Sequence, residues 1–158
     1  KNKCLIEEKI IKHDKLKNLY PNSVNTIRMV IYNGKLVSVV LRMGREEKEV
    51  DNLSAGGIAA GIELDKGIVY TIVRTYYDEK FVYHLDTKVV IPGFSIPMWD
   101  GCKQLVARAE KYCDGIPVIG FDIAVTQKGP TIVEVNEGTE IEALQLPSKE
   151  GYRRKLRD

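Results

Sequence analysis

Two apolar stretches separated by a short polar turn dominate the last third of the chain. Residues 120–125 read GFDIAV, the turn at residues 127–129 reads QKG, and residues 130–138 read PTIVEVNEG. Both stretches are rich in β-branched residues, and a glycine lies in the turn between them. This pattern predicts a β-hairpin.

Three polar residues interrupt the apolar pattern of this hairpin: Asp122, Glu134 and Asn136. Because successive side chains of a strand point to opposite faces, Glu134 and Asn136 are expected on one face, together with Ile132. Whether Asp122 shares that face depends on the length of the loop.

A two-residue loop at residues 128–129 would separate the carboxylates of Asp122 and Glu134, whereas a three-residue loop at residues 127–129 pairs the two residues directly. We favour the longer loop, because Gly129 then takes the position that requires a positive φ and Pro130 begins a strand.

Two carboxylates that face each other across a strand pair repel, and a hard cation removes that penalty. Asp122, Glu134 and Asn136 supply the carboxylate and amide oxygens that Mg²⁺ accepts in proteins. The spacing alone is equally consistent with an ordinary hairpin that has a polar solvent face, so both interpretations remain open at this point.

A second hairpin is predicted around Asn33-Gly34, the strongest turn signal in the sequence, with strands at residues 24–32 and 36–43. Its two-residue loop pairs Tyr32 with Lys35. Counted outward, the same register places Asn25 opposite Arg42 on one face. Arg28 then falls on the other face, unless a bulge shifts the register.

The clearest helix is predicted at about residues 101–113, with Asp100 as its N-cap and residues 114–115 as its end. Trp99 is expected to anchor it in the core. The apolar face of the helix comprises Cys102, Leu105, Val106, Ala109, Tyr112 and Cys113.

Further strand-like stretches occur at residues 5–11 and 62–75. Together these elements predict an α+β domain with a mostly antiparallel sheet and one main packed helix.

Composition narrows the possibilities without selecting a function. The 158 residues suit one domain, and a net charge of +2 gives no reason to expect a nucleic acid or an anionic membrane as partner. No apolar stretch approaches the ~20 residues that span a bilayer. Three scattered cysteines suggest reduced thiols in a cytoplasmic protein. Residues 148–158 are expected to form a solvated tail.

Asp122 followed by Glu134-Val135-Asn136, with Gly129-Pro130 ahead of them, resembles the metal-binding hairpin of the ATP-grasp superfamily. Residues 23–28 (SVNTIR), 51–57 (DNLSAGG) and 96–100 (IPMWD) resemble signatures of its sugar-transfer-associated, alpha-L-glutamate-ligase-related group. These segments lie within a resemblance that extends from about residue 5 to 147. It implies the C-terminal subdomain of an ATP-grasp fold.

The resemblance also implies roles for individual residues. Asp122, Glu134 and Asn136 would hold Mg²⁺ (or Mn²⁺) against the phosphates of ATP, and Arg42 or Arg28 would stabilise the transferred phosphate. The nucleotide would be contacted by a hinge segment, a ribose-contacting residue and a glycine-containing segment beside the triphosphate. The hinge segment would be Glu7, Glu8, Lys9 and Ile10. The ribose-contacting residue would be Asn25. The segment beside the triphosphate would contribute Asn52, Gly56 and Gly57. Judged without the resemblance, the hinge segment is equally typical of a charged edge strand.

The chemistry that the resemblance implies is activation of a carboxylate by ATP to an acyl phosphate, followed by attack of an amine or another nucleophile. The carboxylate would belong to a small molecule or to a sugar-linked substrate, and a link to polysaccharide assembly comes only from the name of the group. Related enzymes also use lysines and a glycine-rich loop from an N-terminal subdomain, which we expect to lie outside this chain. The chain alone is therefore expected to bind nucleotide weakly and not to turn over.

Two other functions remain open: a noncatalytic nucleotide-binding or scaffold domain, and an interaction module with no ligand. His84 lies in a segment that resembles the group, and we interpret it as part of a loop surface rather than as a substrate contact.

Overall fold

The computed structural model describes residues 4, 6–71, 73–75, 80–139, 144, 145, 147 and 151. For residues 73–75 and 80 it describes the backbone alone. The predicted tail at residues 148–158 lies outside this part of the chain, except for residue 151.

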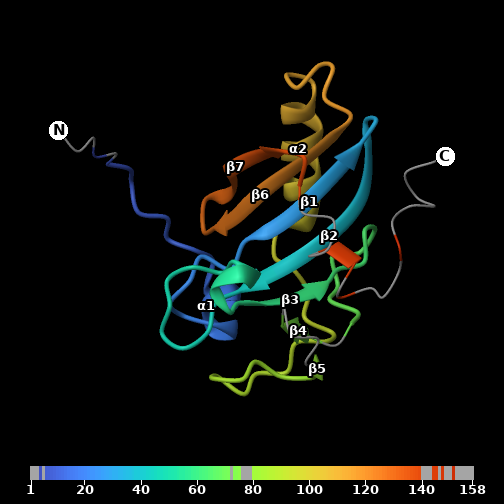
Figure 1. Cartoon of the computed structure of the whole chain (residues 1–158). Helices are drawn as coiled ribbons and strands as arrows, with labels where there is room; N and C mark the ends of the chain where they lie inside the picture. Colours follow the sequence, from blue (N-terminus) through green and yellow to red (C-terminus); the bar gives the residue numbers. More distant parts are fainter. Residues whose placement is uncertain are drawn as a thin grey trace.

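A seven-stranded antiparallel sheet forms the body of the molecule (Figure 1). Its strands lie in the order β5-β4-β3-β2-β1-β6-β7, so β7 is an edge strand. The strands are β1 Ile27–Tyr32, β2 Lys35–Met43, β3 Ile58–Gly61, β4 Val73–Thr75, β5 Lys80–Phe81, β6 Val118–Thr126 and β7 Gly129–Glu137. The helices are α1 Asp14–Leu19 and α2 Trp99–Glu110, with a 3₁₀ turn, η1, at Leu53–Ala55. The α+β class is confirmed.

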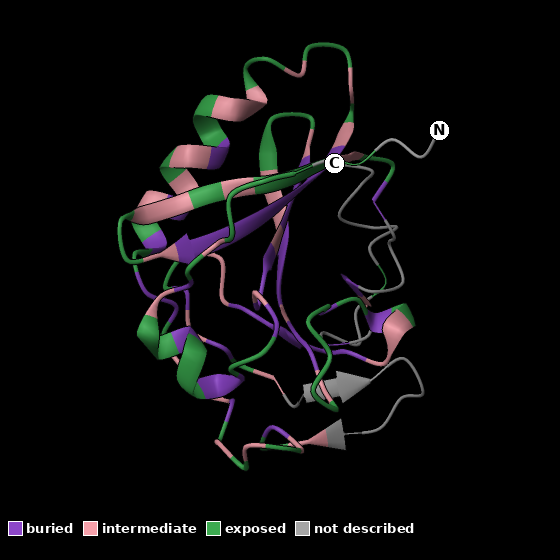
Figure 2. Ribbon diagram, turned by 90° about the vertical axis from the view of Figure 1, so that its left-hand side faces the viewer, coloured by how far each residue is buried: buried purple, intermediate pink, exposed green. Residues whose placement is uncertain are grey.

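The hydrophobic core lies on one face of the sheet, where alternate residues of β1, β2 and β6 meet α1 and α2. Helix α2 packs near β6 and β7 and presents its exposed residues outward (Figure 2). Trp99 anchors it, as expected, because its indole Nε1 donates to the carbonyls of Leu64 and Asp65 at 3.2 Å each. Among the described residues, no helix has the length and apolar character needed to cross a membrane.

The start and the end of α2 differ from the prediction. The helix begins at Trp99 after Met98, whose left-handed backbone (φ 55°) makes it the N-cap, so Asp100 lies in the first turn instead. The helix also ends at Glu110, and Tyr112 beyond it is 91% exposed rather than part of the apolar face.

The β1–β2 hairpin, predicted around Asn33-Gly34, contains a bulge that the sequence does not reveal. Tyr32 pairs with Lys35 as predicted, but the register shifts after Ile31 and leaves Val37 without an opposite residue. As a result Arg42 faces Thr26, to whose carbonyl its amide donates at 2.8 Å. The predicted pairing of Arg42 with Asn25 is wrong, and the bulge brings Arg28 to the same face as Arg42.

For the β6–β7 hairpin the predicted loop length is wrong, but the predicted pairing of the two carboxylates is right. Its loop has two residues, because Thr126 pairs with Gly129, so the favoured three-residue loop is wrong. A register shift at Val133 restores the pairing of Asp122 with Glu134, which is confirmed.

The same shift changes the direction of Ile132. It pairs with Ile123 and packs against the core, so the prediction that it shares a face with Glu134 is wrong.

The segment before α1 differs from the predicted strand at residues 5–11. Its described residues form no strand, and the ladder contact nearest to it is a single bridge between Lys12 and Thr126. The Lys12 ammonium is buried and donates to the carbonyls of Tyr20 (2.6 Å) and Ser23. Burial lowers the pKa of Lys12 to about 8.

His84 is fully buried, so its interpretation as part of a loop surface is wrong. Its ring stacks on Tyr20 with centroids 4.8 Å apart. Its Nε2 lies 2.9 Å from the carbonyl oxygen of Gly44, and its Nδ1 lies 3.2 Å from the amide of Asp86. Burial lowers the pKa of His84 below its ordinary value of 6.5.

The buried histidine predicts an acid-sensitive fold. Because the pKa of His84 is lowered in the native state, the unfolded chain takes up a proton at this side chain first as the pH falls. Its contribution to stability is complete above pH 6.5 and is lost as the pH falls below that value. We expect the free energy of unfolding, measured in urea from pH 7.5 to 5.5, to decrease by at most about 1.4 kcal/mol per pH unit.

The His84→Gln variant is the control, because glutamine keeps an N–H donor and does not titrate in this range. Its stability should vary less over the same interval. Identical pH profiles for the two proteins would contradict the assignment.

Candidate functional site

Two arginines meet one aspartate on the face of the sheet opposite the core. Arg28 on β1 lies directly across from Asp122 on β6, and Arg42 comes from the end of β2. Asp122 is 2% exposed, and its Oδ2 accepts hydrogen bonds from both Arg28 Nη2 and Arg42 Nη2 at 2.8 Å. Arg28 Nε donates to the other oxygen, Oδ1. The carboxylate therefore holds both guanidinium groups in place.

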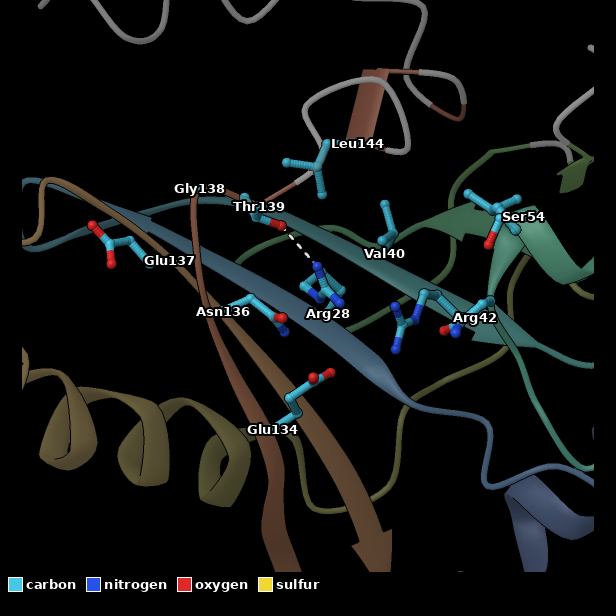
Figure 3. Close-up of a pocket in the computed structure, with 12 residues that line it drawn as sticks. Arg28, Val40, Arg42, Ser54, Glu134, Asn136, Glu137, Gly138, Thr139 and Leu144 are labelled. Atoms are coloured by element: carbon cyan, nitrogen blue, oxygen red, sulfur yellow. Dashed lines mark hydrogen bonds between the residues drawn. The ribbon is translucent and has the colours of Figure 1, made fainter. Parts of the chain in front are cut away.

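Three further residues, none of them predicted as site residues from the sequence, also contact these guanidinium groups or lie beside them. Thr26 Oγ1 accepts from Nε and Nη2 of Arg42 at 3.0 and 2.9 Å. Asp51 accepts from the amide of Thr26 at 2.7 Å, and its other oxygen lies 3.5 Å from Arg42 Nη2. Thr139 accepts from Arg28 Nη1 at 2.8 Å (Figure 3).

Thr26 and Asp51 were within reach of the sequence analysis, because they lie inside the SVNTIR and DNLSAGG segments. Thr139 follows the hairpin, and no motif marks it.

A pocket of about 230 Å³ opens beside the two arginines. Glu134 and Asn136 project from β7 toward Arg28 in Figure 3. The lining residues are Arg28, Val40, Arg42, Asn52, Leu53, Ser54, Glu134, Asn136, Glu137, Gly138, Thr139 and Leu144. The structure thus brings five of the predicted site residues other than Asp122 into one cavity, and Asp122 holds the two arginines that line it.

The structure changes the argument for a metal. Asp122 faces Glu134 as predicted, but its charge is already compensated by Arg28 and Arg42, so a cation is not needed to relieve repulsion. Among the described residues, no group of three or more His, Cys, Asp or Glu side chains could hold a metal ion.

The residues present do fit a cation that also takes oxygens from a phosphate. Glu134 is exposed and supplies a carboxylate, and Asn136 supplies an amide beside it. The Nδ2 of Asn136 is buried and has no hydrogen-bond partner in the described part of the chain. A buried donor of this kind needs an acceptor, which an anionic ligand in the pocket would provide.

Asn25 does not reach this pocket. It is fully buried with a left-handed backbone (φ 60°), and its Nδ2 donates to the carbonyls of Leu16 (2.7 Å) and Tyr20 (2.8 Å). Its Oδ1 accepts from the Ser23 hydroxyl at 2.6 Å. These bonds tie α1 to the start of β1, which is a structural role.

The glycine-containing segment contributes only in part. Asn52 lines the pocket, but Gly56 and Gly57 are not among the lining residues. The amides of Gly56 and Gly57 donate to the carbonyls of Leu53 and Asn52, at 2.9 and 3.0 Å, so they are not directed at an anion. Gly57 is required for packing instead, because a Cβ there would lie 2.6 Å from the carbonyl oxygen of Asp51.

The hinge residues line a different cavity. Glu8, Lys9 and Ile10 border a pocket of about 520 Å³ together with the β6–β7 turn and Ile132. Glu7 is exposed and is not among its lining residues. Ile132 lies two residues before Glu134, about 7 Å along β7. One edge strand therefore connects the hinge pocket with the arginine pocket.

The paired arginines predict a large effect of removing their counter-charge. We expect Asp122→Ala to lower the free energy of unfolding by about 3–5 kcal/mol, because two largely buried guanidinium groups lose their shared carboxylate. Urea unfolding at pH 7.5 measures this.

Asp100→Ala is the matched control. Asp100 pairs with Lys103 at 3.0 Å, but its side chain is 83% exposed, so its loss should cost less than about 1 kcal/mol. Equal losses in the two variants would show that Asp122 does not stabilise the arginines.

Comparison with known proteins places the chain in a family. The model of the family described as sugar-transfer associated ATP-grasp matches residues 1–158, which is the whole chain. None of the curated proteins matches it. The family match supports an ATP-binding, ligase-type function in general. The chain belongs to the sugar-transfer associated ATP-grasp family.

Proposed function

We propose that this chain is the ATP- and Mg²⁺-binding half of an ATP-dependent carboxylate–amine ligase, or of a closely related ligase. The observation that carries the proposal is the convergence of Arg28 and Arg42 on Asp122 beside Glu134 and Asn136. Two fixed cations, a carboxylate and an unpartnered amide on one open sheet face suit a metal-bound polyphosphate.

The sizes of the two pockets favour a divided nucleotide site. Ligand pockets usually measure about 300–1,000 Å³, so the arginine pocket is too small for a whole nucleotide and the hinge pocket is large enough for a base. We place the phosphates beside Arg28 and Arg42, and the base beside Glu8, Lys9 and Ile10. The nucleotide would then cross the edge of the sheet at β7.

The roles of the side chains follow from their chemistry. Arg42 and Arg28 hold anionic oxygens through charge-assisted hydrogen bonds, each contributing about 1.5–3 kcal/mol. Glu134 and Asn136, with Asp122 behind them, would hold Mg²⁺, which when bound neutralises charge during phosphoryl transfer to the substrate carboxylate. Formation of an acyl phosphate in this way requires no side-chain nucleophile.

Two residue types that commonly act as nucleophile or base, a histidine and a cysteine, are buried and do not line the pocket. His84 is buried away from the pocket, and burial raises the pKa of the Cys102 thiol to about 12. This agrees with a mechanism based on positioning and charge.

The remaining groups are assigned to partners. A second ATP-grasp subdomain would supply lysines and a glycine-rich loop to the open side of the phosphates. The acceptor would be a carboxylate on a small molecule or on a sugar-linked substrate.

A noncatalytic nucleotide-binding or scaffold domain is the alternative. It is favoured by the bonds of Arg42, since Nε and Nη2 already contact Thr26, Asp122 and Asp51 within the protein. An arginine held in this way can stabilise the fold without binding a ligand.

Metal binding gives the first test. Mn²⁺ should raise the melting temperature of the wild-type protein, because a ligand at 100 times its Kd stabilises by about 2.7 kcal/mol. Glu134→Gln should abolish that shift, whereas Glu63→Gln, in a turn paired with Lys66, should retain it. An equal Mn²⁺ response in all three proteins would remove Glu134 from the metal site.

Turnover separates the ligase from the scaffold. In the complete gene product that contains these residues, phosphate release from ATP should require both Mg²⁺ and a carboxylate acceptor. Arg42→Ala should slow it about tenfold to a hundredfold, the equivalent of one lost charge-assisted bond. Binding of Mg-ATP without release across a panel of carboxylates would favour the scaffold.

A further inference from the structure

The turn at residues 84–87, the HLDT segment, makes three side-chain contacts with two other parts of the chain. His84 Nε2 lies 2.9 Å from the carbonyl oxygen of Gly44. The Asp86 carboxylate accepts from the amide of Glu46 at 2.8 Å. The Thr87 hydroxyl donates to the carbonyl of Leu19 at 2.6 Å. Two of the three contacts thus go to the loop at residues 44–50.

The hydrogen bonds define the tautomer of His84. The amide of Asp86 can only donate, so Nδ1 is the acceptor at 3.2 Å and Nε2 carries the proton that is donated to Gly44. The ionisable groups around this ring are Asp86, Arg45 and Tyr20. The contacts of the ring with the main chain of Gly44 and Asp86 are therefore made in its neutral form.

The loop at residues 44–50 connects two parts of the arginine site. It begins just after Met43, the last residue of β2, and so follows Arg42 closely. It ends before Asp51, which binds the Thr26 amide and lies near Arg42. Asn52 then lines the arginine pocket. A shift of this loop would therefore move groups on two sides of Arg42.

This loop has an unfavourable backbone that needs external support. Glu46 and Glu47 have positive φ values of 56° and 61°, a region that residues with side chains rarely adopt. Among the described residues, the Asp86 carboxylate is the acceptor found for the amide of Glu46. At the start of the loop Gly44 is tightly enclosed, since a Cβ there would lie 2.8 Å from the carbonyl oxygen of Val50.

We propose that His84 and Asp86 are positioning residues for the arginine pocket. They hold the loop at residues 44–50, and the loop in turn keeps Arg42, Asp51 and Asn52 in their places around the pocket. The proposal rests on the proposed function for its ligand, Mg-ATP. It assigns a role to the HLDT segment that does not require contact with any substrate.

Substitution of Asp86 is the main test, because Asp86 is exposed and its removal leaves the core intact. In the complete gene product, Asp86→Ala should weaken Mg-ATP binding about tenfold by calorimetry. Asp86→Asn keeps an oxygen acceptor for the Glu46 amide and should restore affinity to within about twofold of wild type.

The matched control comes from the same turn. Thr87→Val removes the contact with Leu19 at the end of α1 but leaves both contacts with the loop. It should lower the melting temperature without changing Mg-ATP affinity. Equal loss of affinity in Thr87→Val and Asp86→Ala would overturn the proposal, because general destabilisation would then explain both.

A second readout does not depend on nucleotide binding. The Nε–Hε NMR signal of Arg42 reports its bond to Thr26 and should shift in Asp86→Ala and in His84→Leu, and should return in Asp86→Asn. If His84→Leu does not fold, the Asp86 pair alone decides. An unchanged Arg42 signal in folded Asp86→Ala would overturn the positioning role. Failure of wild type to bind Mg-ATP would instead count against the proposed function, and the NMR comparison would still test the loop.

Discussion

The carboxylate of Asp122 is the group on which the arrangement of the site depends. Two positively charged guanidinium groups on adjacent interior strands would repel each other if no carboxylate lay between them. A single aspartate with both oxygens engaged compensates both charges and fixes both side chains. Each buried charge is tolerated because its partner is present in good geometry. The site is therefore preorganised by the protein before any ligand arrives.

That arrangement requires correct registers in two separate hairpins. Val37 and Val133 each occupy a position with no opposite residue, and each bulge reverses the facing of the residues beyond it. Without the first bulge Arg28 and Arg42 would point to opposite faces. Without the second, the two-residue loop would place Asp122 opposite Val133 instead of Glu134. The mixed polar face is thus produced by irregularities in the strands, not by simple alternation.

The sequence was sufficient for the strands of the two hairpins and for the main helix apart from its ends. The pairing of Asp122 with Glu134 was predicted correctly, but from a loop length that is wrong. The sequence was not sufficient for the bulges, because Val37 and Val133 have neighbours that are themselves apolar or β-branched and carry no mark of an interrupted ladder. The burial of Asn25 and His84 was also missed. Asn25 donates to the main-chain carbonyls of Leu16 and Tyr20, and His84 contacts the carbonyl of Gly44, which is 40 residues away. No sequence motif marks such contacts, because they exist only once the chain has folded. Of the glycine-containing segment that the resemblance selected, Asn52 reaches the pocket, whereas the amides of Gly56 and Gly57 donate to carbonyls of their own turn.

The position of β7 at the edge of the sheet has a consequence for motion in the site. Arg28, Arg42 and Asp122 come from β1, β2 and β6, which have strands on both sides, whereas β7 has one neighbour in the described sheet. Edge segments open at a lower free energy than interior strands, so amide hydrogens of β7 should exchange with solvent well before those of β1. The two halves of the pocket therefore differ in stiffness. The cationic half is rigid, and the half that carries Glu134 and Asn136 can adjust its backbone to the ligand, so ligand binding should slow amide exchange chiefly along β7.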